Sequence, residues 1–121
     1  DPAIRVNLER DRGWASLAYA LGKAGFVVDE KDYENGVYQV SLDPEMQENK
    51  KSLWRRFFGV FKPSALKDKN PEDGRFKVSI QASEEPGWME IRIVNPAAQA
   101  RGETSPDAQE QMLVMIKGYL T

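Results

Sequence analysis

Residues 105–120 read SPDAQEQMLVMIKGYL and carry the clearest helical pattern of the chain. At about 100° per residue, their apolar side chains fall within one arc about 160° wide. This arc contains Ala108, Met112, Leu113, Met115, Ile116, Tyr119 and Leu120. Thr104 or Ser105 can cap the first turn, and Pro106 suits the first helical position because no amide donor is needed there. Burying the arc would contribute on the order of 10 kcal/mol before entropy is subtracted, so the rest of the chain must supply a surface that covers it.

The chain before this helix predicts five strands and one shorter helix. Alternating apolar and polar residues predict strands at 3–8, 26–30, 36–42, 75–82 and 88–94. Apolar residues at helical spacing predict a helix over residues 12–24, with Asp11 as its N-cap and Gly25 as its C-cap. Asn35-Gly36 predicts a hairpin turn between the second and third strands.

The order of these elements predicts the fold class. It is strand, helix, two strands, an insertion at about residues 43–74, two strands and a helix, with residues 95–103 as a plain connection. Because four of the five strands alternate clearly, one face of an antiparallel sheet should be buried, and both helices can lie on that face. We therefore expect a single α+β domain over residues 1–121 in which an antiparallel five-stranded sheet packs on a long C-terminal helix, a helix-grip arrangement.

Composition limits the function classes. The 121 residues are 40% apolar and 30% charged, which is typical of a soluble globular domain, and no run approaches the ~18 apolar residues of a membrane span. A net charge of −2 argues against bulk nucleic-acid binding. The sequence contains neither cysteine nor histidine, so it lacks a thiol nucleophile and the commonest general base and metal ligand. It starts at Asp1 without methionine or a signal peptide, so we expect a domain excised from a longer protein.

The most informative functional stretch is KKSLWRRFFGVFK, residues 50–62. On a helical projection its aromatic and apolar side chains share one arc, and the other side is basic. At about 15 Å such a helix is too short to span a bilayer, but it can lie in a membrane interface or dock into a groove on another protein. The candidate partner- or membrane-binding residues are Leu53, Trp54, Arg55, Arg56, Phe57, Phe58 and Phe61. The alternative is that the aromatic face packs on the chain's own sheet and the basic residues form a solvated rim.

Catalysis and metal binding have little support in the sequence. There is no nucleophile elbow, no phosphate-binding glycine loop and no metal-ligand spacing. Asp29, Glu30, Asp32 and Glu34 lie near Gly36, but a calcium loop aligned on this glycine would have unsuitable residues at its ligand positions. A solvated hairpin end explains the acidic residues better. We therefore expect no enzyme activity, no cofactor and no metal.

Several segments together carry a family resemblance. RVNLERDRGW, residues 5–14, is followed by Leu17, Ala20-Leu21, Ala24-Gly25-Phe26 and Gly36-Val37-Tyr38, and later by GRFKV and IVNP, residues 74–78 and 93–96. Over nearly the whole chain, this order resembles the helix-grip domains of BamC-type (NlpB-like) lipoproteins. The resemblance implies a non-catalytic subunit of the outer membrane β-barrel assembly machinery (BAM complex), anchored by a lipidated N-terminal cysteine. Such proteins carry two domains of this kind after an extended segment that contacts a BamD-type partner, and residues 1–121 include neither the cysteine nor that segment.

The resulting expectation is a scaffold or regulatory domain that acts through protein–protein contacts in outer membrane protein assembly. Its expected partners are other subunits of the machinery, with the membrane surface as a second candidate. Its expected location is the outer membrane, through the absent N-terminal anchor, with the periplasmic side favoured and surface exposure as the alternative. The alternative function is binding of a lipid or small apolar ligand in a cleft between the sheet and the C-terminal helix, with Met89, Met112 and Met115 as candidate lining residues.

Overall fold

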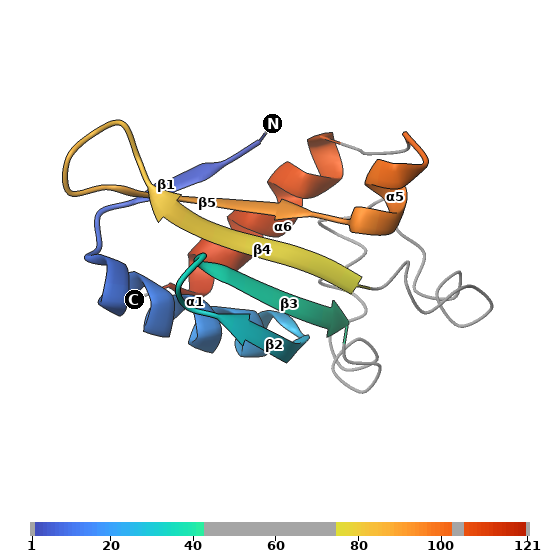
Figure 1. Cartoon of the computed structure of the whole chain (residues 1–121), viewed down its shortest axis with the longest axis horizontal. Coiled ribbons are helices and arrows are strands. Elements are labelled where there is room, and N and C mark those ends of the chain that lie inside the picture. Colours follow the sequence, from blue (N-terminus) through green and yellow to red (C-terminus); the bar gives the residue numbers. More distant parts are fainter. Residues whose placement is uncertain (1, 43–74, 103–105, 121) are drawn as a thin grey trace.

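The computed structural model of the chain describes residues 2–42, 75–102 and 106–120. Their elements follow in the order β1 (Ile4–Val6), α1 (Arg10–Ala24), β2 (Phe26–Asp32), β3 (Val37–Leu42), β4 (Arg75–Ala82), β5 (Met89–Val94), α5 (Pro96–Ala100) and α6 (Pro106–Tyr119). The five described strands form one sheet in the order β1-β5-β4-β3-β2, and every neighbouring pair is antiparallel (Figure 1). The expected α+β class and antiparallel five-stranded sheet are confirmed.

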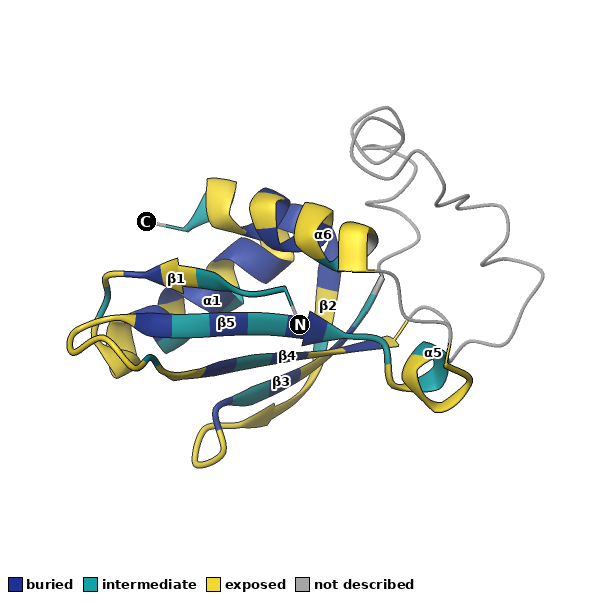
Figure 2. Cartoon of the chain, turned by 90° about the horizontal axis from the view of Figure 1, so that it is seen from above, coloured by how far each residue is buried: buried dark blue, intermediate teal, exposed yellow. Residues whose placement is uncertain are grey.

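Helices α1 and α6 contact each other on one face of this sheet (Figure 2). α1 packs on β2 and β4, while α6 packs on β5 and β1. Alternate side chains of the strands meet the helices in one buried cluster, which includes Tyr38, Val78, Ile91, Leu17 and Ile116 at 0 or 1% exposure. The prediction that both helices lie on the buried face is therefore confirmed, and the opposite face of the sheet, here called the outer face, carries the polar alternation.

The relative lengths of the two helices differ from the prediction. α6 has 14 residues and α1 has 15, so the expected long C-terminal helix with a shorter helix after the first strand is wrong. α1 begins at Arg10 with Glu9 as its N-cap, and the Gly13 amide donates to the Glu9 carbonyl at 2.7 Å. Asp11, predicted as the N-cap, lies in the first turn, where its carboxylate accepts a hydrogen bond from Tyr33. The helix therefore begins two residues earlier than predicted, and this contact between distant segments helps to order its first turn.

The structure also contains a short helix, α5, where we predicted a plain connection. The Asn95 side chain accepts a hydrogen bond from the Ala98 amide at 3.0 Å, and Pro96 occupies the first turn. Asparagine followed by proline is a typical helix start, so the signal was present in the sequence. β1 is shorter than predicted, at three residues, whereas β4 has the predicted bounds.

The β2–β3 hairpin closes at Gly36, as predicted. Gly36 has φ +66°, and its amide donates to the Tyr33 carbonyl at 3.1 Å. Its carbonyl accepts a hydrogen bond from the Ile80 amide at 2.8 Å, which attaches the turn to β4. A Cβ atom at this position would lie 2.3 Å from the Ile80 carbonyl oxygen. Glycine is therefore needed both for the left-handed backbone and for the close approach of two chain segments.

Candidate interaction surface

The residues predicted to bind a partner or the membrane lie outside the described residues. They are Leu53, Trp54, Arg55, Arg56, Phe57, Phe58 and Phe61, all within 43–74. Their role stays a prediction. The described surface has three features that bear on function: an aromatic contact between α1 and the β2–β3 hairpin, the loop between β4 and β5, and the outer face of the sheet.

The aromatic contact holds the hairpin against the start of α1. The Trp14 and Tyr38 rings stack with centroids 3.9 Å apart, and Tyr33 meets Trp14 edge-on at 5.5 Å. The Arg10 guanidinium lies 4.4 Å from the Tyr33 ring centroid. Burial raises the pKa of Tyr38 to about 12, so its hydroxyl stays protonated at neutral pH and donates to the Trp14 carbonyl at 2.8 Å. The pKa of Tyr33 is also raised, chiefly by its hydrogen bond to Asp11.

These contacts give a physical role to residues that carry the family resemblance. Gly13 lets α1 approach β4, because a Cβ there would lie 3.0 Å from the Ile80 Cδ1 atom. Trp14 and Tyr38 join the helix to β3, and Gly36 joins the hairpin turn to β4. Gly13, Trp14, Gly36 and Tyr38 therefore help to determine how α1 packs on the sheet.

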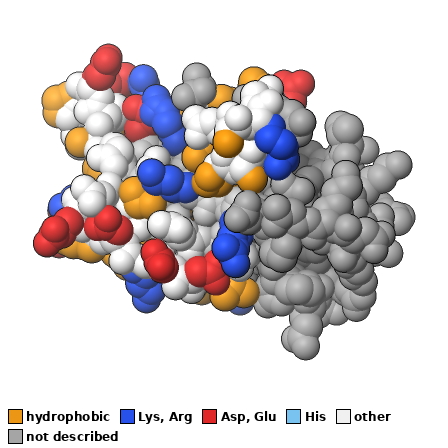
Figure 3. Space-filling view, turned by 45° about the vertical axis from the view of Figure 1, so that its right-hand side comes forward, with side chains coloured by type: hydrophobic (Ala, Val, Ile, Leu, Met, Phe, Trp, Pro, Cys, Tyr) orange, Lys and Arg blue, Asp and Glu red, His pale blue; other side chains and the backbone are white. Residues whose placement is uncertain are grey.

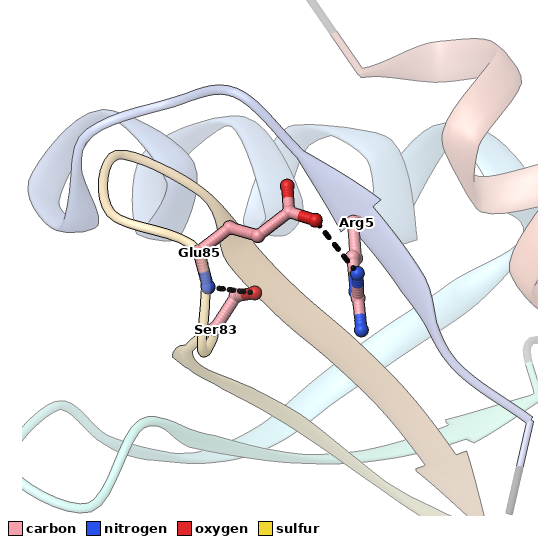
Figure 4. A network of polar contacts seen from close by, with 3 residues as sticks. All are labelled: Arg5, Ser83 and Glu85. Atoms are coloured by element: carbon pink, nitrogen blue, oxygen red, sulfur yellow. Dashed lines mark hydrogen bonds and ion pairs between the residues drawn. The ribbon is translucent and has the colours of Figure 1, made fainter.

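The loop between β4 and β5 is fastened to β1 by an exposed ion pair (Figure 4). The Arg5 Nη1 atom lies 3.3 Å from Glu85 Oε1, and the Glu85 amide donates to Ser83 Oγ at 3.1 Å. The two charged side chains are 50% and 60% exposed, so the pair contributes at most about 1 kcal/mol. Trp88, at the end of this loop, is 37% exposed. The loop is therefore a surface turn.

The acidic hairpin end also has a structural role. Asp32 accepts hydrogen bonds from the Asn35 amide at 3.2 Å and from the Asn35 side chain at 2.7 Å. The hydrogen bonds from Asn35 lower the pKa of Asp32, so this carboxylate stays charged and stabilises the turn. Within residues 2–42, 75–102 and 106–120, no group of three or more acidic side chains is placed to hold a metal ion.

The outer face carries two adjoining hollows, which we call the outer trough. The larger, of about 470 Å³, lies between α5 and the outer sides of β2, β3 and β4, and is lined by Asp29, Gln39, Val40, Arg75, Phe76, Lys77, Pro96, Ala97 and Ala100. The smaller, of about 240 Å³, lies beside the hairpin turn and is lined by Glu30, Lys31, Asp32, Asn35, Val37, Gln39 and Lys77. Gln39 and Lys77 line both hollows, so the trough is continuous. Figure 3 shows basic and acidic side chains together on this side of the molecule.

One row across the outer trough carries opposite charges at its two ends. Glu30 on β2 pairs with Gln39 on β3, and Gln39 pairs with Lys77 on β4, so the three residues form one row across the sheet. The row therefore has an acidic end on β2, a basic end on β4 and a neutral residue between them, and Lys31 also lines the smaller hollow from β2. Asp29 on β2 and Arg75 on β4 line the larger hollow. The sequence indicated only a solvated face here, because the row depends on strand register and the larger hollow depends on α5.

Nothing in the described part of the chain supports the ligand cleft that we considered between the sheet and the C-terminal helix. Its candidate lining residues Met89, Met112 and Met115 are 7%, 4% and 4% exposed and belong to the single buried cluster. Both hollows of the outer trough lie on the other side of the sheet. Methionine at these positions fills the core between α6 and the strands.

No protein-family model matches the sequence, and no curated protein matches it. The resemblance to BamC-type lipoproteins therefore rests on the quoted residues themselves. Among the described helices, none is both long enough and apolar enough to cross a membrane.

Proposed function

We propose that this chain is a helix-grip domain of a BamC-type lipoprotein and a non-catalytic scaffold or regulatory part of the outer membrane β-barrel assembly machinery. The observation that carries the proposal is the interlocking of the residues behind the resemblance. Gly13 and Trp14 lie more than 20 residues before Gly36 and Tyr38, yet Trp14 stacks on Tyr38 and both glycines approach Ile80 of β4. A chance similarity of short motifs would not require them to form one contact unit.

The proposed mechanism is binding rather than chemistry. The sheet and the two helices share one closed apolar cluster, which gives a rigid support for surface contacts. The β4–β5 loop and the segment at 43–74 are then the places where assembly subunits would bind. The proposal also places the domain at the outer membrane through an N-terminal lipid anchor, with the periplasmic side favoured.

The test is co-purification from native cell envelopes with the full anchored protein. The parent is compared with a variant in which Leu53, Trp54, Phe57 and Phe58 are replaced by serine. The matched control replaces four residues on the exposed side of α6 by serine: Glu110, Gln111, Val114 and Lys117. Barrel-assembly subunits should accompany the parent and the control. Their loss in the first variant would assign the contact to the 43–74 segment, and equal recovery would assign it elsewhere in the protein. Absence of assembly subunits from all three samples would refute the proposed function.

A further inference from the structure

The outer trough has a charge pattern that complements itself. Around Gln39, Glu30 lies one strand to one side and Lys77 one strand to the other side, in the same row. Two strand spacings place their Cα atoms about 10 Å apart. Neither residue takes part in the two ion pairs of the described part of the chain, Arg5–Glu85 and Glu90–Arg92.

We infer that the outer trough is a self-association surface, on which a second copy of this chain packs face to face about a two-fold axis. The axis runs parallel to the strands and passes above Gln39. A rotation about it exchanges the two sides of the face and keeps each row at its own level along the strands. Glu30 of each copy then faces Lys77 of the other, and the two Gln39 side chains meet at the axis.

The larger hollow fits the same arrangement. One of its walls is α5, with Pro96, Ala97 and Ala100, and its other side is formed at Asp29 on β2. The two-fold axis moves α5 of the second copy from the β4 side to the β2 side, so it enters this hollow. Asp29 on β2 and Arg75 on β4 also line this hollow and add opposite charges to it, although they belong to different rows. The space beside α5 is thus filled by the same element from the other copy.

A second copy fits this face better than a partner with one sign of charge. A uniformly basic or acidic surface would be attracted by one side of the trough and repelled by the other. The two-fold arrangement satisfies both sides at once, and each contact is formed twice because the interface is isologous.

The size of the face sets the strength of the association. Three strands about 5 Å apart and about seven residues long present a face of roughly 15 by 20 Å. This is well below the ~800 Å² per partner of a standard stable complex. The dimer should therefore be weak, with a dissociation constant on the order of 0.1–1 mM, and it should be favoured by low salt.

The test is sedimentation equilibrium of the purified 121-residue chain at concentrations up to about 1 mM, at low and high salt. Glu30→Lys makes both ends of the Glu30–Gln39–Lys77 row basic, and Lys77→Glu makes both ends of this row acidic. The dissociation constant of each variant alone should be at least about tenfold higher than that of the parent, because two contacts change from attraction to repulsion. An equimolar mixture of the two variants should regain association, since every contact then joins opposite charges.

The controls are Glu110→Lys and Lys117→Glu, which make the same charge changes on the exposed side of α6. They should associate like the parent, and thermal unfolding should show that all four variants remain folded. A parent that stays monomeric at about 1 mM in low salt would overturn the inference. So would a dimer that the trough variants leave unchanged, or a mixture that associates no better than its components. Because only the purified chain is used, these outcomes are independent of the proposed role in barrel assembly.

Discussion

Replacing Gly36 with alanine should destabilise the protein more strongly than an ordinary loop substitution. The left-handed backbone, with φ +66°, costs an L-residue about 1 kcal/mol. The added Cβ would lie 2.3 Å from the Ile80 carbonyl oxygen, so β4 and the turn must separate. Their separation stretches the 2.8 Å hydrogen bond from the Ile80 amide to the Gly36 carbonyl, at a further cost of about 1 kcal/mol, and disturbs the packing beneath it by about 1 kcal/mol more. We therefore expect the free energy of unfolding to fall by about 3 kcal/mol.

Gly102 offers a matched control for this substitution. It has φ +70°, but no atom of the described residues lies within 4 Å of a Cβ built there. Gly102→Ala should therefore cost only the backbone contribution of about 1 kcal/mol. The difference between the two variants, about 2 kcal/mol, then measures the close approach of the turn to β4.

Urea denaturation followed by tryptophan fluorescence gives both free energies of unfolding, and a melting temperature about 10 °C lower for Gly36→Ala would agree with them. A difference of less than about 0.5 kcal/mol between the two variants would refute the reasoning, because the turn would then move away from β4 at almost no cost. A Gly36 variant that is unfolded under conditions where the Gly102 variant is folded would support the larger cost.

The remaining predictions concern α1, its contact with β3, and α5. Gly22→Ala should raise the free energy of unfolding by about 1 kcal/mol, because the position is helical and open. Gly13→Ala should raise the free energy of unfolding by less than half of that, since a Cβ there is only 3.0 Å from a β4 side chain. Paired urea titrations compare the two variants. Tyr38→Phe should cost about 1 kcal/mol at pH 7 through loss of its 2.8 Å hydrogen bond. Burial raises the pKa of Tyr38 to about 12 from its usual 10.0, so the unfolded chain releases the hydroxyl proton at lower pH than the folded chain does. The parent should therefore lose stability as pH rises from 10 to 12, and the Phe variant should lose less stability over the same range. Asn95→Ala should destabilise α5 by about 1 kcal/mol, with faster amide hydrogen exchange confined to that helix; equal exchange in both proteins would rule out the capping role.

The elements with a strong local pattern were predictable from the sequence. β4 has the predicted bounds because its buried residues alternate with polar ones along most of its length. α6 begins within one residue of the predicted start, since Pro106 can occupy only the first turn of a helix. In both cases the pattern needs no information from distant residues.

The elements that depend on distant contacts were not predictable in the same way. The first turn of α1 is held by Tyr33, which donates to Asp11 from a position 22 residues away. No periodicity in the segment around Asp11 contains that information. The capping role predicted for this aspartate follows from local preference alone, and the contact with the hairpin overrides it.

The charge pattern of the outer trough has the same kind of origin. Simple alternation from the buried Phe26 would place Asp29 and Lys31 on the outer face of β2, giving that side mixed charge. The register of β2 against β3 instead shifts between Val28 and Glu30, which is a β-bulge. Because one extra residue exchanges the two faces of every following position, Glu30 comes into the row of Gln39 and Lys77, and the next outer position is also acidic. The bulge therefore places a carboxylate at the β2 end of this row, opposite in charge to Lys77 at the β4 end, and this makes the row complementary to itself.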